Sequence, residues 1–116
     1  MAVIVQKLRK EFEVNIEKAI KYYSILSVLN DLNLTVKQIE LLAFTSVRGT
    51  ITPPSARQEF VNMFGSSTAS LENIKNKLAR LGWMVEIDKM YRVNPRLNLD
   101  FSKNIILQIN LESSGE

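Results

Sequence analysis

The hydrophobic pattern of this chain changes its period at Gly82, and this change constrains the fold more than any other feature. Residues 68–81 place a leucine or isoleucine on one side at every third or fourth position, which is the spacing of an amphipathic helix. Residues 83–87 and 91–93 instead alternate apolar and polar side chains, as strands do, with residues 88–89 between them as a short turn. A helix that leads directly into a β-hairpin predicts an α+β domain.

Residues 35–47 are predicted to form a helix upstream of this segment. Thr35 and Gln38 have the spacing of a capping box, in which the side chain of each residue accepts a hydrogen bond from the backbone N–H of the other. Gly49 is suited to a left-handed C-cap, because glycine has no Cβ to clash there. The residues expected to face the core are Val36, Ile39, Leu42 and Ala43.

A second helix is predicted to begin at Thr52-Pro53 and to end at Gly65. Thr52 is expected to cap it, and Pro53 lies in its first turn, where the missing N–H costs nothing. After a tight turn at Gly65, Ser66-Ser67 open the helix over residues 68–81. The apolar positions of these two helices are Phe60, Val61, Phe64, Leu71, Ile74, Leu78 and Leu81.

Residues 34–94 resemble a winged helix-turn-helix domain. Residues 59–65, Glu-Phe-Val-Asn-Met-Phe-Gly, have the form of the first helix of that motif, and residues 66–70, Ser-Ser-Thr-Ala-Ser, look like the hydroxyl-rich start of its recognition helix. Residues 78–83, Leu-Ala-Arg-Leu-Gly-Trp, are similar to the step that leads into the wing. Residues 34–42 resemble the opening helix of the multiple-antibiotic-resistance-regulator type and of related plasmid and phage replication proteins.

The resemblance implies three core helices with a β-hairpin wing, and a function in binding double-stranded DNA as a transcriptional regulator or a replication or partition factor. The helix over residues 68–81 would enter the major groove, with short hydrogen-bonding side chains at its N-terminal end. Asn73 and Asn76 are candidates for adenine edges, and Glu72 for cytosine, although its carboxylate repels phosphate. The candidate phosphate contacts are Ser66, Ser67, Lys75 and Lys77, while Lys89 and Arg92 would lie along the DNA backbone or reach a minor groove. The start of the helix adds the outward-facing Thr68 and Ala69, and Ser70.

The N-terminal flank is predicted to contain strands followed by a helix. Residues 2–16 alternate like strands around a charged connector, although a helix that begins before residue 10 is the alternative. Residues 15–30 have helical spacing with Asn15 as a possible N-cap. Their apolar surface is so wide that burial from more than one side is expected.

The C-terminal flank is predicted to end in a further strand. Residues 104–112 carry apolar side chains at every second position, and a short helix is the less favoured alternative. Residues 113–116 are expected to be a disordered tail. The chain is thus expected to be one domain over residues 1–116, in which segments 1–33 and 95–112 flank the motif core.

The composition excludes several kinds of chemistry. The 116 residues include no Cys and no His, which removes disulfides, zinc fingers, thiol nucleophiles and imidazole bases. No phosphate-binding loop, dinucleotide fingerprint or metal-ligand spacing occurs, so no enzyme activity, cofactor or metal site is predicted. The net charge of +3 permits nucleic-acid binding without demanding it. No apolar run is long enough to span a bilayer and no secretion signal is recognised, so a cytoplasmic protein without a membrane partner is expected.

Two functions follow from these observations. In the first, the protein binds DNA as a homodimer, built from the flanking segments, whose two recognition helices read half-sites one turn apart. In the second, it is a non-enzymatic structural or assembly protein, of phage or archaeal type, that uses the same fold for protein–protein contacts. Residues 2–6 and 104–112 would then add edge strands to a neighbour's sheet.

Overall fold

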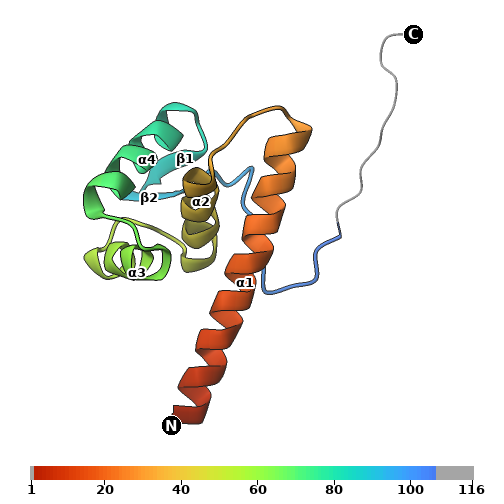
Figure 1. Cartoon of the computed structure of the whole chain (residues 1–116), viewed down its shortest axis with the longest axis vertical. Coiled ribbons are helices and arrows are strands. Elements are labelled where there is room, and N and C mark those ends of the chain that lie inside the picture. Colours follow the sequence, from red (N-terminus) through yellow and green to blue (C-terminus); the bar gives the residue numbers. More distant parts are fainter. Residues whose placement is uncertain (1, 107–116) are drawn as a thin grey trace.

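In a computed structural model, residues 2–106 are described, with side chains described from residue 6 onward. This part of the chain contains four helices and one two-stranded antiparallel sheet, which confirms the predicted α+β class (Figure 1). The elements are α1 (Ala2–Leu29), α2 (Val36–Arg48), α3 (Pro54–Phe64), α4 (Thr68–Arg80), β1 (Met84–Ile87) and β2 (Met90–Val93).

Helix α2 lies at the centre and contacts α1, α3, α4 and β2. Its residues 41–45 are all buried, and because consecutive helical residues point about 100° apart, such a run must be covered from every side. The ring of Phe44 makes edge contacts with Phe12 of α1, at 5.9 Å between centroids, and with Phe60 of α3, at 5.5 Å. Three of the four core positions predicted for α2 are buried. Val36 is 72% exposed, because in the first turn of α2 no described element covers it.

Residues 2–16 belong to α1, so the strands predicted there are wrong and the alternative, a helix that begins before residue 10, is confirmed. The 28 residues of α1 form one helix of roughly 42 Å at 1.5 Å per residue. No Gly or Pro interrupts residues 2–29, and Phe12, Ile16, Ala19 and Tyr23 lie on the one side that packs against the core. Asn15 therefore lies inside the helix rather than capping it. Figure 1 shows the N-terminal part of α1 extending beyond the other helices.

The outer side of α1 is not buried, contrary to the predicted burial from more than one side. Towards the C-terminal end of α1, Ile25, Val28 and Leu29 are 37%, 79% and 51% exposed. Within residues 2–106, α2 and the segment after the hairpin both contact α1, and neither covers the side that carries these three residues. The exposed apolar residues at this end remain without a described partner.

The loop between α2 and α3 is tied to β2 rather than to the start of α3. The hydroxyl of Thr52 accepts a hydrogen bond from the backbone N–H of Tyr91, at 2.7 Å, so the predicted capping by Thr52 is wrong. Pro53 stands at the N-cap without a side-chain hydrogen bond, and Pro54 occupies the first turn. The backbone N–H of Ile51 donates to the carbonyl of Tyr91 at 3.2 Å. Residues 51–52 thus lie alongside β2 and are joined to it by one backbone and one side-chain hydrogen bond.

The predicted hairpin and its turn are confirmed. In β1 and β2, Met84 lies opposite Val93 and Ile87 lies opposite Met90. The two turn residues, Asp88 and Lys89, have φ values of 54° and 63°. Two left-handed residues in succession are typical of the type I′ turn, whose twist matches that of the flanking strands.

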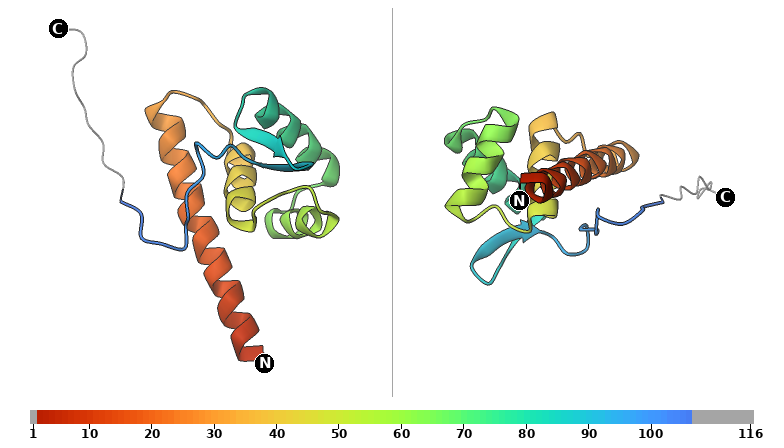
Figure 2. Two further views of the ribbon diagram at one scale, coloured as in Figure 1. Left: turned by 180° about the vertical axis from the view of Figure 1, so that it is seen from behind. Right: turned by 90° about the horizontal axis from the view of Figure 1, so that it is seen from below.

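After β2 the chain returns to α1 without forming a helix or strand, and Figure 2 shows it crossing that helix. Phe101 is 3% exposed, and its ring lies 5.7 Å from Tyr22 and 6.2 Å from Tyr23 between centroids. The hydroxyl of Tyr23 lies 3.3 Å from the carbonyl of Leu97 and 3.1 Å from Ser46 Oγ. The strand predicted over residues 104–112 is wrong for 104–106, and its remainder and the predicted tail lie outside the described residues.

Candidate functional site

Helix α4 begins where the sequence predicts, and local signals explain why. Gly65 has a φ of 61°, the left-handed conformation that glycine adopts without a steric cost, and it ends α3. Ser67 is the N-cap of α4, and its hydroxyl accepts a hydrogen bond from the backbone N–H of Ser70 at 3.1 Å. Ser66 and Ser70 are half-buried in this turn. The hydroxyl of Ser67 is therefore engaged in capping.

The two sides of α4 differ sharply in exposure. Leu71 and Leu78 are completely buried, and Ile74 is half-buried against the core. The opposite side is exposed and polar, and we call it the α4 face. Its residues are Thr68, Ala69, Asn73, Asn76, Lys77 and Arg80. These six residues carry two positive charges and no carboxylate.

Five of the six residues of the α4 face were candidates from the sequence, and Arg80 was missed. A signal for it was available, because Arg80 follows Asn76 by four residues and Lys77 by three, which places all three on one side of a helix. Arg80 lies in the last turn of α4, where a cation also complements the helix dipole.

Glu72, the one carboxylate of α4, is neutralised by two neighbours. It forms an ion pair with Arg57 of α3, and its Oε2 lies 3.2 Å from Lys75 Nζ. Burial alone would raise the pKa of Glu72. The hydrogen bonds and positive charges of Lys75 and Arg57 lower this pKa by more than burial raises it, so the net shift is downward. The carboxylate is thus held ionised between two cations, which weakens its repulsion of an approaching phosphate.

Lys75 packs inside the protein rather than projecting from the α4 face. Its side chain is only 11% exposed, and its Nζ lies 4.3 Å from the ring centroid of Tyr91 on β2. An ammonium at this distance over an aromatic ring is a cation–π contact. Lys75 therefore joins α4 to the hairpin, and of the two lysines of α4 that were predicted to meet phosphate only Lys77 is exposed.

The hairpin contributes less positive charge than the sequence suggests. Arg92 is half-buried, and its guanidinium donates a hydrogen bond to the carbonyl of Gly49 at 3.2 Å. Lys89 is exposed in the turn, but Glu86 and Asp88 are exposed beside it. The exposed end of the hairpin thus has one cation against two carboxylates, and the positive charge of the site lies on α4.

Within the described residues, no group of three or more acidic side chains is placed to hold a metal ion. No helix in this part of the chain is both long enough and apolar enough to cross a membrane. Comparison with protein-family models, with curated proteins and with solved structures finds no match for this chain.

Proposed function

We propose that this protein binds double-stranded DNA through a winged helix-turn-helix, with α2, α3 and α4 as its core helices and β1–β2 as its wing. The order of elements from α2 to β2 is the order that the sequence resemblance implies. The observation that carries the proposal is the α4 face, which is exposed and polar on a helix whose other side is anchored in the core.

In this function α4 lies in the major groove, which is about 12 Å wide and admits one helix. The amides of Asn73 and Asn76 are exposed one turn apart and can pair with adenine edges. Lys77 and Arg80 meet phosphates at the C-terminal end of the helix. Lys75 and Arg92 hold the wing against the core, so that its position relative to α4 is fixed before DNA binds.

The salt dependence of binding tests this assignment. Each phosphate contact contributes about 0.9 to the slope of log affinity against log salt concentration, so Lys77→Ala with Arg80→Ala should reduce the slope by about 1.8. Fluorescence anisotropy with labelled fragments of mixed sequence measures both quantities. The matched control is Lys21→Ala with Lys103→Ala, which removes two exposed positive charges from α1 and from the segment after the hairpin.

The control should leave the slope near that of the wild type. The proposal would be refuted if the wild-type protein bound no duplex at low salt. It would also be refuted if the α4 double variant and the control double variant gave equal slopes. Asn73→Ala with Asn76→Ala should instead change which sequences are selected from a random pool, because these residues carry no charge.

The alternative function, an assembly protein that extends a neighbour's sheet, loses within the described residues the edge strands that were predicted for it. It depended on edge strands at residues 2–6 and 104–112. Residues 2–6 lie in α1, and residues 104–106 form no strand.

A further inference from the structure

The C-terminal end of α1 leaves an apolar surface uncovered. Ile25, Val28 and Leu29 share the outer side of the helix, and Leu32, in the loop that follows, is 40% exposed. Ile25, Val28 and Leu29 also line a shallow hollow with Ser24. We call these four apolar residues, Ile25, Val28, Leu29 and Leu32, the α1 end patch. Contiguous apolar surface of this kind usually marks a place where another segment binds.

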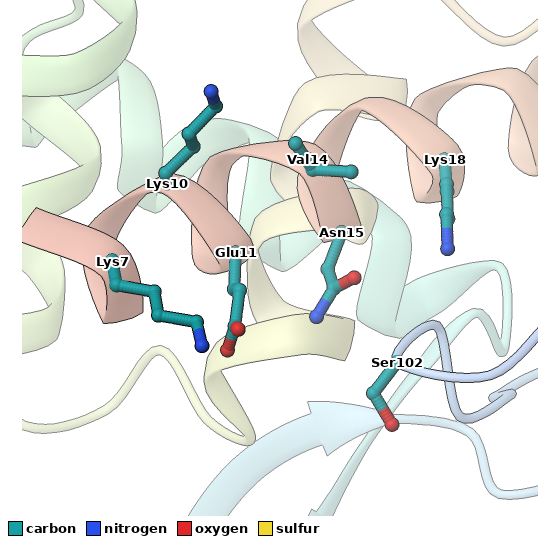
Figure 3. Close-up of a pocket in the computed structure, with 7 residues that line it drawn as sticks. All are labelled: Lys7, Lys10, Glu11, Val14, Asn15, Lys18 and Ser102. Atoms are coloured by element: carbon teal, nitrogen blue, oxygen red, sulfur yellow. The ribbon is translucent and has the colours of Figure 1, made fainter.

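The chain after the hairpin runs along α1 towards this patch. Ser102 lies beside Asn15 and Lys18, both of which point towards it (Figure 3). A few residues later, Asn104 to Ile106 line the next hollow along α1 with Tyr22 and Ile25. The chain therefore advances from residues 15–18 of α1 to residues 22–25 as it proceeds. The described part ends at Ile106, about one helical turn before Val28.

The sequence that follows continues the alternation that begins at Ile105. Ile105 is half-buried against the core, whereas Ile106 is 92% exposed. In an extended chain every second side chain lies on the same side. An extended conformation would therefore place Leu107, Ile109 and Leu111 on the side of Ile105, and in the sequence the polar residues Gln108, Asn110 and Glu112 alternate with them.

The length of this segment is sufficient to pass the three patch residues that lie on α1. Six extended residues after Ile105 span roughly 20 Å. The rise of α1 from Ile25 to Leu29 is only about 6 Å. We propose that residues 107–111 of the same chain dock on the α1 end patch, with Leu107, Ile109 and Leu111 covering Val28, Leu29 and Leu32.

Disulfide trapping tests the proposal cleanly, because the natural chain contains no cysteine. The test variant carries Val28→Cys and Leu107→Cys. The matched control carries Asn30→Cys and Leu107→Cys, since Asn30 is exposed, directly follows the end of α1, and has its amide turned back to the carbonyl of Leu26. Oxidation by air at low protein concentration, followed by mass spectrometry of the linked peptides, reports which pair forms.

A docked segment should link to position 28 on the order of tenfold faster than to position 30, and within one chain, because burying leucines favours one side of the helix. Equal rates for the two pairs would show an undocked tether and overturn the proposal. Links that join two chains only would also overturn it, because a second copy would then cover the patch.

A measurement without cysteines gives an independent check. Leu107→Asn with Ile109→Asn and Leu111→Asn should accelerate hydrogen exchange of the amides of residues 26–32 by on the order of tenfold, because the end of α1 loses its apolar cover. The control, Gln108→Ala with Asn110→Ala and Glu112→Ala, changes only the other side of the segment and should leave exchange unchanged. Equal exchange in the wild type and both variants would contradict docking.

Discussion

Replacing Lys75 distinguishes a structural role from a role in DNA binding. The sequence alone places this lysine on the flank of α4 as a phosphate contact, whereas the structure places its ammonium 4.3 Å from the centre of the Tyr91 ring and 3.2 Å from Glu72. We therefore expect its removal to destabilise the fold and to leave the salt dependence of DNA binding unchanged.

The expected loss in the free energy of unfolding is the sum of three contributions. A largely buried cation–π contact is worth about 1 kcal/mol. The ion pair adds about 0.5 kcal/mol, a small value because Glu72 is one-third exposed and keeps Arg57 as a partner. The buried methylene stem adds about 0.5 kcal/mol. Lys75→Ala should thus lower the free energy of unfolding by about 2 kcal/mol, and Lys75→Met, which keeps the stem, by about 1.5 kcal/mol.

Urea unfolding measures both losses, and a double-mutant cycle with Tyr91→Leu isolates the contact with the ring, with an expected coupling of about 1 kcal/mol. If both Lys75 variants unfold at the wild-type urea concentration while Lys75→Ala lowers the salt slope by about one counterion, the structural role is refuted. Lys75 would then be a phosphate contact, as its position in the sequence indicates.

Three further outcomes are expected. The pKa of Glu72 in the folded protein lies below its ordinary value of 4.5, so the ionised carboxylate stabilises the fold above pH 4.5. This stabilisation is lost as the pH falls through the folded-state pKa. The urea midpoint of Glu72→Gln should therefore depend less on pH in the acid range than that of the wild type. Burial raises the pKa of Tyr23 to about 12, so stability is lost between pH 10 and 12, and Tyr23→Phe should remove one late step from the phenolate absorbance titration. Phe101→Ala should cost about 3 kcal/mol in urea unfolding, and a loss below about 1 kcal/mol would mean that the segment after the hairpin does not anchor on α1.

The features that the sequence predicts correctly are those whose partners are close in the chain. Both hydrogen bonds of the capping box at Thr35 and Gln38 are present, at 3.1 and 2.9 Å. Gly65 ends α3 in a left-handed conformation that glycine adopts without a steric cost, and the turn at residues 88–89 follows from the strands on either side. These three signals are each complete within a few residues, whereas the local cap predicted at Thr52 was displaced by a contact with Tyr91, 39 residues away.

The features that the sequence does not predict depend on residues far apart in the chain. The alternation of residues 2–16 fits a strand, but Phe12 and Ile16 also fit a helical stripe, and the presence of α2 beside them decides between the two periods. The sequence predicts Lys75 and Arg92 to be exposed cations. In the folded chain Lys75 contacts the ring of Tyr91 and Arg92 donates to the carbonyl of Gly49, and neither contact can be predicted from the local sequence. The winged-helix assignment and the homodimer remain predictions.

The hydrogen bond from Tyr91 to the hydroxyl of Thr52 connects the hairpin to the start of α3 through a side chain where a sheet would normally use a backbone carbonyl. A carbonyl is the same in every residue, but a hydroxyl is present only while the codon specifies Ser or Thr. A single base change at Thr52 can therefore remove this bond, while the bond from the backbone N–H of Ile51 to the carbonyl of Tyr91 does not depend on the residue type. The attachment of the hairpin to the loop before α3 thus depends on the identity of residue 52 more than a pairing of backbone groups alone would.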